Sequence, residues 1–309
     1  MSEISAIPPP DTSPDKATPV PAPPSPPSVK TLKSWAPLYL KKTDATISQL
    51  SKIFSTSRGT DTLLLTICYT SLLASNLLSR ISLSRIERLS RQLIESAISL
   101  PPNTTVFIDT SAIPPSRLLI TSQRLKALSE LISDFRIFTR LWGLLGIWKW
   151  GKSVLLNLQE EGDKDLTAKR IEAAQVVVNV AYQYLENGAY LSSKGILNWS
   201  KEQQGKAWVW SSRFWMMHVG LDFWRLGREW MLRRSKGKGK VVDGGVTNVG
   251  EEEWKVKWRR EMVVNMAYAP LTIHWSLEEG LVNEFWVGLL GSIAGITGSR
   301  ELWKQSGKI

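Results

Sequence analysis

The stretch NMAYAPLTIHWSLEEGLVNEFWVGLLGSIAGITGSRELW, which runs from Asn265 to Trp303, decides the fold class. A strand would need apolar and polar residues to alternate, and this stretch shows no sustained alternation. Pro270 instead predicts the start of a helix, where its missing backbone N–H leaves no hydrogen bond unmade. The run from His274 to Glu278 follows, and then a predicted helix with glycines at 288, 291, 295 and 298.

The same pattern extends over the rest of the chain. A helical periodicity begins around Trp35 to Thr56 and continues almost unbroken, whereas Leu100 to Ser116, with two proline pairs, is predicted to be a loop. Arg233 to Gly250 (RRSKGKGKVVDGGVTNVG) is predicted to be a flexible, partly basic linker. The fold class that follows is all-α, a bundle of about seven or eight helices.

The N-terminal residues differ from the rest in composition. Residues 1–30 contain ten of the sixteen prolines and show no apolar periodicity. This composition is typical of a disordered or polyproline-type tail. Residues 31–309 are expected to form a single helical, membrane-associated domain that contains the linker at 233–250.

Charge and tryptophan content indicate an anionic partner. The formal net charge is +11, and the 15 tryptophans outnumber Tyr (6) and Phe (7) together. Trp prefers the boundary between apolar core and lipid headgroups, although it also fills helical cores. Nucleic acid is disfavoured as a partner because the basic residues are spread over many segments and interleaved with acids. An anionic phospholipid membrane is therefore the expected partner.

The segment from Arg80 to Ile98 is predicted to be an amphipathic helix. On a helical wheel its apolar and charged residues separate onto opposite sides, and such a helix can lie in the interface of a bilayer. The apolar side holds Leu83, Ile86, Leu89, Leu93, Ile94 and Ala97, and the basic residues expected to bind the membrane are Arg85, Arg88 and Arg91.

A second amphipathic helix is predicted from Arg124 to Lys152. Insertion of its apolar face into one leaflet would favour membrane curvature. The alternative, that this helix faces the protein's own core, stays open. The residues expected to bind the membrane are Arg124, Lys126, Leu128, Phe135, Arg136, Phe138, Arg140, Trp142, Leu145, Trp148, Lys149 and Trp150.

Two uncharged segments are candidates for crossing a bilayer. As helices, Thr62 to Ser79 would span about 27 Å and Phe285 to Ser299 about 22 Å, against a hydrocarbon core of about 30 Å. Neither is predicted to be a secure span. The first also carries a stripe of serines, which favours packing against protein: Ser71, Ser75, Ser79 and Ser82.

The glycines at 288, 291, 295 and 298 allow close approach of another helix. Gly288, Gly291, Gly295 and Gly298 are therefore expected to mediate oligomerisation in or along the membrane. Packing against a helix of the same chain is the equally weighted alternative.

No catalytic, cofactor or metal site is predicted, so the protein is not expected to be an enzyme. Its two histidines, His218 and His274, are far apart in the sequence, and Cys68 is its single cysteine, so no cluster of metal ligands is recognisable. His274 is expected to be a packed or hydrogen-bonded residue at a helix end. Cys68 is expected to be a small core residue.

Four segments, in order along the chain, resemble the peroxisomal biogenesis factor 11 family. The resemblance covers about residues 45 to 309 and is carried by Gly59-Thr-Asp61-Thr-Leu63-Leu64 with Tyr69, by Ser129 through Arg136 to Arg140-Leu141, by Glu186-Asn187 with Leu191 and Gly195-Ile-Leu, and by Asn265–Trp303. The chain departs from the family at Thr62 and Leu65, where basic residues are common, and at Tyr268-Ala269, where an Asp-Leu pair is frequent. These departures suggest a divergent, fungal-type member.

The resemblance implies a protein of the peroxisomal membrane that inserts amphipathic helices, associates with itself and with related members, and elongates the membrane before the organelle divides. It implies as partners the dynamin-type fission machinery with its adaptor, and a peroxisomal membrane import receptor. A different class stays open: a peroxisomal membrane channel or transport component, in which Thr62–Ser79 and Phe285–Ser299 line a pore for small metabolites.

Overall fold

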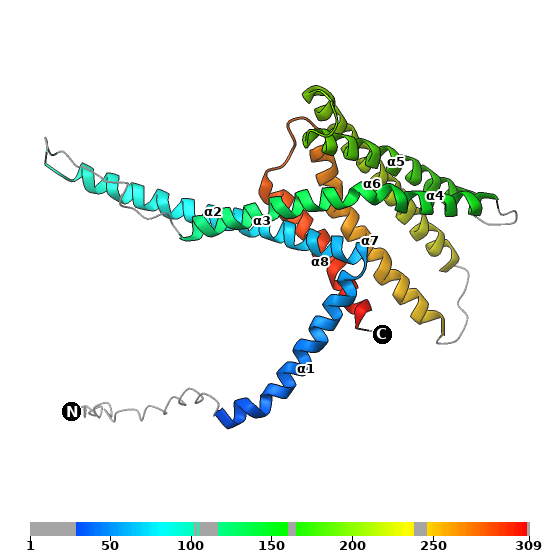
Figure 1. Cartoon of the computed structure of the whole chain (residues 1–309), viewed down its shortest axis with the longest axis horizontal. Coiled ribbons are helices and arrows are strands. Elements are labelled where there is room, and N and C mark those ends of the chain that lie inside the picture. The colour runs from blue at the N-terminus through cyan, green and yellow to red at the C-terminus, as the bar shows by residue number, and fades with distance from the viewer. Residues whose placement is uncertain (1–28, 102–103, 105–116, 160–164, 238–245, 308–309) are drawn as a thin grey trace, which may run out of the picture. The chain divides into compact units, whose positions relative to one another are not determined.

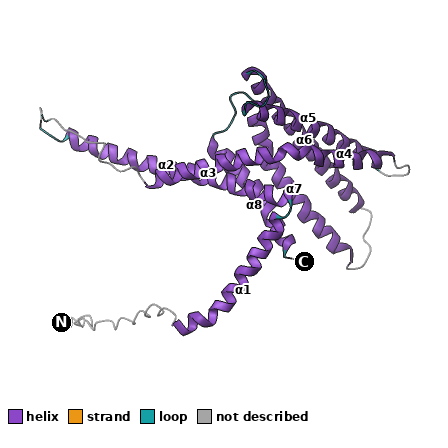
Figure 2. Ribbon diagram, viewed as in Figure 1, coloured by secondary structure: helices purple, strands orange, loops and turns teal. Residues whose placement is uncertain are grey.

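A computed structural model of the chain describes residues 29–101, 104, 117–159, 165–237 and 246–307. Every regular element within these residues is a helix, so the predicted all-α class is confirmed (Figures 1 and 2). The predicted proline-rich tail lies outside the described residues, except for its last two positions, which belong to the first helix. The chain divides into two compact units, 1–48 and 49–309. The fold and site described below belong to the second unit.

The first helix, α1 (Val29–Phe54), begins in the first unit and ends in the second. Side chains that accept a hydrogen bond from the first turn fix where α2, α5 and α8 begin, namely those of Thr56, Asp165 and Asn283. The remaining elements are α2 (Ser57–Ile98), α3 (Arg117–Thr139), the 3-10 turn η2 (Arg140–Trp142), α4 (Gly143–Gln159), α5 (Leu166–Ser193), α6 (Lys201–Gly237), α7 (Val246–Trp275) and α8 (Glu284–Ser306).

Helix α2 packs against both α3 and α8. Two reciprocal hydrogen bonds join it to α3: Ser75 Oγ donates to the Ser122 carbonyl at 2.7 Å, and Ser122 Oγ donates to the Ser75 carbonyl at 2.8 Å. Seven residues further along each helix, Cys68 of α2 lies buried against Ser129 of α3. The predictions that the serine stripe packs against protein and that Cys68 is a core residue are therefore confirmed.

The other helices form a second group. Helices α5, α6 and α7 pack in chain order, and α4 lies against α5. Leu226 and Leu271 are fully buried, and the Trp258 indole donates to the Leu226 carbonyl at 2.9 Å, which ties α7 to α6. An ion pair of 2.8 Å between Arg260 and Glu301 joins α7 to α8, and so joins the two groups.

Three predicted boundaries have different outcomes. The loop predicted for 100–116 is confirmed at its ends, because α2 ends at Ile98 and α3 begins at Arg117. The linker predicted for 233–250 is wrong in part: α6 continues to Gly237 and α7 begins at Val246, and residues 238–245 lie outside the described residues. The prediction that Pro270 starts a helix is wrong, because this residue lies inside α7. It is tolerated there because it is close to the C-terminal end, where few turns follow the lost hydrogen bond.

The connection from α7 to α8 is organised by His274, in the last turn of α7. Its Nδ1 accepts hydrogen bonds from the backbone N–H groups of Leu281 at 2.8 Å and Val282 at 3.2 Å. Gly280 has a φ of +65°, and a Cβ there would lie 2.4 Å from the His274 ring, so the turn requires glycine. The prediction that His274 is a hydrogen-bonded residue at a helix end is confirmed.

Acidification should loosen this connection. Because Nδ1 accepts, the ring is neutral with its proton on Nε2, and burial lowers the pKa of His274. A lowered pKa means that the folded state resists protonation. The stabilisation is therefore complete above the ordinary histidine pKa of about 6.5 and is lost as the pH falls below that value.

Hydrogen exchange at the Leu281 and Val282 amides, corrected for intrinsic rates, should accordingly accelerate between about pH 7.5 and about pH 5. His274→Gln should remove this pH dependence. An equal acceleration in that variant would show that another group controls the connection.

Candidate functional site

A stripe of apolar side chains runs along α3, η2 and α4. Its members recur every three or four residues, which places them on one face, and each is between 40% and 74% exposed. Single exposed apolar residues are ordinary, but a contiguous run is typical of an interaction surface. The α3–α4 stripe consists of Leu128, Leu131, Phe135, Phe138, Trp142, Leu145 and Trp148.

The end of α2 is exposed on all sides. Every residue from Leu83 to Ile98 is exposed, and no described helix covers this part, because α3 begins only opposite the middle of α2. We call Leu83–Ile98 the free end of α2. Both faces of the predicted amphipathic helix are therefore open to the surroundings, including the basic residues Arg85, Arg88 and Arg91.

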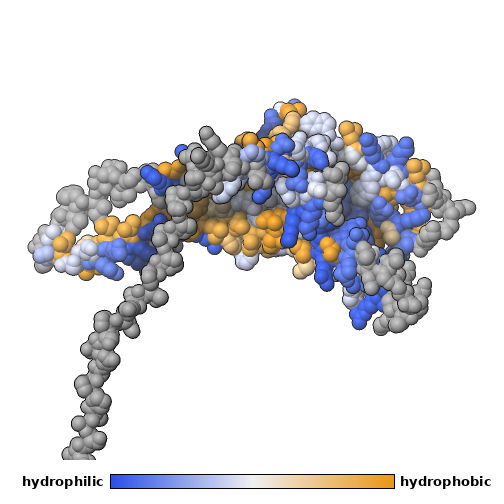
Figure 3. Space-filling model, turned by 90° about the horizontal axis from the view of Figure 1, so that it is seen from below, coloured by the Kyte–Doolittle hydropathy of each residue, from blue (hydrophilic) through white to orange (hydrophobic). Residues whose placement is uncertain are grey.

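Apolar residues form patches over α2 and its neighbours in the space-filling view (Figure 3). Of the described helices, α2 is the one long and apolar enough to cross a membrane by length and composition, and 22% of its most apolar window is buried. A core helix of a soluble protein can be equally long and apolar, so these two properties alone do not identify a membrane span. The exposed stripe and the free end of α2 are thus the more specific candidates for contact with lipid.

The basic residues predicted to bind the membrane fall into two groups. Arg124 and Lys149 are exposed near the two ends of the α3–α4 stripe. Lys126 instead forms an ion pair with Glu284 of α8, with 2.8 Å between Nζ and Oε1, and its hydrogen bond to this carboxylate raises its pKa.

Arg136 points into the protein, although it was predicted to face lipid. Its side chain is 9% exposed, and its guanidinium makes a two-pronged contact with Asp61: Nε donates to Oδ1 at 2.8 Å and Nη2 to Oδ2 at 3.3 Å. The antiparallel register that sets Ser75 against Ser122 also brings Asp61 opposite Arg136. A cation enclosed in an apolar interior needs such a partner.

Arg140 likewise contacts an internal acid. Its Nη2 lies 3.1 Å from Oε1 of Glu186, a residue of α5 that is 6% exposed. The hydroxyl of Tyr182 donates to the same oxygen at 2.9 Å. Burial raises the pKa of Glu186, and the neighbouring Arg140 opposes that rise. We call Asp61, Arg136, Arg140, Glu186 and Tyr182 the ion network.

Two atoms of the ion network lack a partner. The Arg140 side chain as a whole is 30% exposed, but its Nε is enclosed, and neither this atom nor Glu186 Oε2 has a hydrogen-bond partner among the described residues. Each such group costs about 1–3 kcal/mol. This ion pair therefore keeps one donor and one acceptor without a partner among the described residues.

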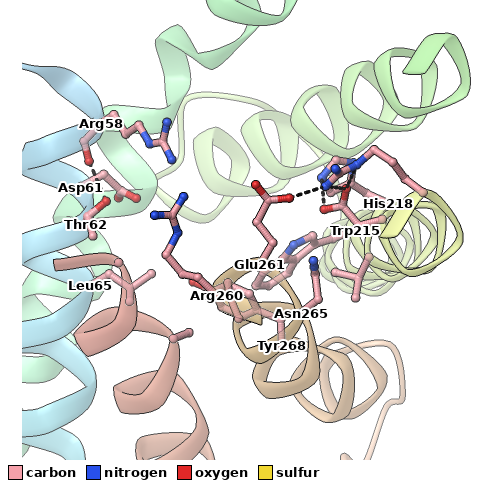
Figure 4. Close-up of a pocket in the computed structure, with 16 residues that line it drawn as sticks. Arg58, Asp61, Thr62, Leu65, Trp215, His218, Arg260, Glu261, Asn265 and Tyr268 are labelled. Atoms are coloured by element: carbon pink, nitrogen blue, oxygen red, sulfur yellow. Dashed lines mark hydrogen bonds and ion pairs between the residues drawn. The ribbon is translucent and has the colours of Figure 1, made fainter. Parts of the chain in front are cut away.

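Three cavities border the ion network, and two of them are bounded by Asp61, Leu65, Trp215 and Tyr268. The first of these two, of about 580 Å³, has six charged residues among the sixteen that line it (Figure 4). Most of these charges are paired: Arg225 Nη2 contacts Asp222 at 3.1 Å and Glu261 at 2.9 Å. The second, of about 630 Å³, is lined in part by Arg136, Arg140 and Glu186 of the ion network.

The predicted continuous helix from Arg124 to Lys152 is interrupted at η2. Gly143 lies so close to α5 that a Cβ would sit 2.6 Å from the Gln183 amide oxygen. Trp150 then points to α5, because its indole donates to Glu172 at 3.0 Å. Trp150 is half-buried, whereas Trp148 is 74% exposed, and contact of either with lipid stays a prediction.

The glycine ladder packs inside the chain. A Cβ at Gly288 would lie 2.8 Å from the Leu73 backbone nitrogen, and one at Gly291 would lie 2.3 Å from the Tyr69 ring. Gly295 and Gly298 meet α2 in the same way. The face expected to mediate oligomerisation is thus occupied by α2, and the alternative of intramolecular packing describes these four glycines.

Sequence reasoning missed Asp61, Glu186 and Tyr182 as site residues. One signal was present, because Asp61 directly precedes the uncharged run from Thr62 to Ser79. An isolated charge beside a long apolar segment is expected to have a partner of opposite sign. No comparable charge pattern marks Glu186, although Asp61 and Glu186 both stand in the segments that carry the family resemblance.

The chain is similar to an uncharacterized protein of Schizosaccharomyces pombe, with 26% identity over 198 residues that make up 64% of this chain and 84% of that protein. No protein-family profile matches the chain. No solved structure matches it.

Proposed function

We propose that this protein shapes the peroxisomal membrane: it lies in one leaflet through the α3–α4 stripe and the free end of α2, and it elongates the membrane before the organelle divides. The observation that carries the proposal is the stripe itself, seven large apolar side chains on one face that are each at least 40% exposed. Phe138 and Trp142 contact each other across the break at η2, with ring centroids 5.3 Å apart, which links the α3 and α4 parts of the stripe.

The energetics favour contact with lipid. Full burial of a Leu or Phe side chain contributes about 1.5–3 kcal/mol, so covering the exposed part of the stripe supplies on the order of 10 kcal/mol. Each basic residue near an anionic surface adds about 1 kcal/mol. Arg124 and Lys149 by the stripe, and Arg85, Arg88 and Arg91 on the free end of α2, are exposed and available for this contact.

The peroxisomal part of the proposal rests on the resemblance to the biogenesis factor 11 family. The matched segments are far apart in the sequence, yet they supply Asp61, Arg136, Arg140 and Glu186, which meet in the ion network. Because the motifs that resemble the family form one internal cluster, they support a fold common to this chain and the family. On this proposal the partners are related family members, the dynamin-type fission machinery with its adaptor, and a peroxisomal membrane import receptor.

Co-sedimentation with liposomes of rising anionic content tests the proposal. The double variant Phe135→Ser/Trp142→Ser should bind about ten- to a hundredfold more weakly than the wild type, since two exposed aromatics are lost from the contact. Electron microscopy of the wild-type samples should show tubules. The matched control is Met217→Ser/Trp224→Ser on α6, whose side chains are 51% and 57% exposed.

The control variant should bind as the wild type does. An equal loss in both variants would mean that the stripe is not the lipid contact, and binding without tubules would contradict the shaping role. Solute flux through reconstituted vesicles would support the transport alternative instead. That alternative requires α2 and α8 to separate, because the two helices are in direct contact through the glycines.

A further inference from the structure

A cavity of about 410 Å³ lies between the C-terminal part of α6 and the N-terminal part of α7, and none of its lining residues belongs to the ion network. Each helix contributes residues spaced three or four apart, which places them on one face. We call this cavity the α6–α7 pocket. It is lined by Trp230, Arg233 and Arg234 of α6 and by Glu251, Trp254, Lys255, Trp258 and Arg259 of α7.

The charged side chains of the α6–α7 pocket are mostly basic. Its one acid, Glu251, is already paired with Lys255, with 3.3 Å between the Glu251 Oε1 and Lys255 Nζ atoms. Arg233, Arg234 and Arg259 are exposed, and none of the three forms an ion pair with a described residue. These three guanidinium groups therefore favour an anionic ligand.

Two of the arginines stack on tryptophans of the same pocket. The guanidinium carbon of Arg233 lies 4.3 Å from the centre of the Trp254 ring, and that of Arg234 lies 5.1 Å from the centre of the Trp230 ring. Stacking uses the face of a guanidinium group and leaves the N–H donors, which lie in its plane, free for an acceptor. The donors are thus held in place before a ligand binds.

The number of guanidinium groups favours a phosphomonoester over other biological anions. Such a group carries a charge of about −1.5 to −2 and three strong acceptor oxygens. A carboxylate, or the phosphodiester of an ordinary phospholipid, carries a single negative charge and two such oxygens. Arginine matches phosphate with paired N–H···O bonds, so three arginines around one cavity suit the more highly charged group.

The apolar residues beside the arginines favour a lipid as the source of this phosphate. Trp230 is 43% exposed at the pocket, and the next two residues of α6, Met231 and Leu232, are 60% and 42% exposed. A soluble phosphate compound would leave these side chains in water, whereas Trp is favoured at the level of lipid headgroups. Basic clusters on helices that also expose apolar residues are typical of phosphoinositide-binding surfaces.

We infer that the α6–α7 pocket binds the phosphomonoester of a phosphorylated lipid headgroup, with Arg233, Arg234 and Arg259 as its donors. The inference rests on the proposed function for the presence of a membrane, but the pocket and the α3–α4 stripe are formed by different side chains. The stripe would supply affinity for any anionic bilayer, and the pocket would select one class of lipid within it.

Co-sedimentation of the full chain with two kinds of phosphatidylcholine vesicle tests the inference. One kind contains phosphatidylinositol monophosphate, and the other contains phosphatidylglycerol, a phosphodiester, at the same total negative charge. The wild type should bind the first about tenfold more tightly, because the phosphomonoester alone can engage all three arginines. The soluble headgroup of the same lipid, an inositol bisphosphate, should compete and remove this preference.

Arg234→Gln/Arg259→Gln is the decisive variant. Both arginines are exposed and form no ion pair with a described residue, so the fold does not depend on them. The variant should lose the preference between the two vesicles and still bind the phosphatidylglycerol vesicles, which shows that it is folded. The matched control is Arg300→Gln/Lys304→Gln on α8, which removes two exposed charges and should keep the tenfold preference.

The outcomes separate the inference from the proposed function. Equal binding of both vesicles by the wild type, or a preference that survives in Arg234→Gln/Arg259→Gln, would overturn the pocket alone. Loss of the preference in the control as well would show that total charge and not the pocket decides. Binding of the soluble headgroup without binding of either vesicle would reject membrane shaping and would assign the pocket to a soluble phosphate compound, against the lipid inferred here.

Discussion

Replacing Asp61 with alanine should lower the free energy of unfolding by about 3 kcal/mol. The substitution leaves Arg136, whose side chain is 9% exposed, without the carboxylate that it contacts twice. The expected loss is at the lower end of the range for buried pairs because Asp61 itself is 41% exposed, so that water can partly replace it. Chemical denaturation of the purified chain measures the change.

Two controls separate this effect from general loss of charge. Glu202→Ala breaks an exposed pair with Lys206, whose partners are 75% and 68% exposed, and should cost less than about 0.5 kcal/mol. The double variant Asp61→Ala/Arg136→Leu removes the buried charge together with its partner and should recover much of the stability. If the double variant is as unstable as Asp61→Ala, the cost does not come from an unpaired guanidinium.

Gly288→Ala should destabilise the protein by about 1–3 kcal/mol, although alanine is the better helix former. The added Cβ would lie 2.8 Å from the backbone nitrogen of Leu73, and a backbone cannot rotate away as a side chain can. Helices α2 and α8 would therefore have to move apart along their whole contact. Thermal or chemical unfolding of the variant and the wild type shows whether the free energy of unfolding falls or rises.

The same substitution at an open position should have the opposite sign. Gly220 lies inside α6, and a Cβ there would meet no atom within 4 Å. Gly220→Ala should therefore stabilise the protein by up to about 1 kcal/mol through helix propensity alone. A stabilising Gly288→Ala would show that α2 and α8 are not in close contact in solution.

Much of the architecture could be predicted from local pattern. Apolar periodicity indicates helices without reference to their partners, and the proline pairs mark the connection between α2 and α3. The stripe of serines on α2 predicts a side that faces protein. In the structure these serines are mostly buried, and Ser75 bonds to Ser122 of α3. The exposed apolar residues of α3 and α4 were also identified from periodicity, although their contact with lipid stays a prediction.

The errors concern residues whose role depends on a distant partner. Arg136 and Arg140 lie on a helix that also bears exposed bases, and periodicity cannot distinguish a solvated arginine from one that faces an acid on another helix. Only the pairing of α2 with α3 and of η2 with α5 decides this. The glycine ladder is ambiguous for the same reason, since small residues admit a helix of the same chain or of another equally well.

In water the free end of α2 is held helical only by the turns that precede it. The free end, residues 83–98, is only slightly longer than the about 12–15 residues below which an isolated helix is marginal, and from Leu83 onward every side chain is exposed, so that little packing supplements the backbone hydrogen bonds. Its last turns therefore open at little cost, whereas the part of α2 between α3 and α8 opens only with the whole fold. A lipid surface that covers the apolar side would complete the helix. One continuous helix thus has two local stabilities, and on the proposed function a membrane would lengthen its ordered part.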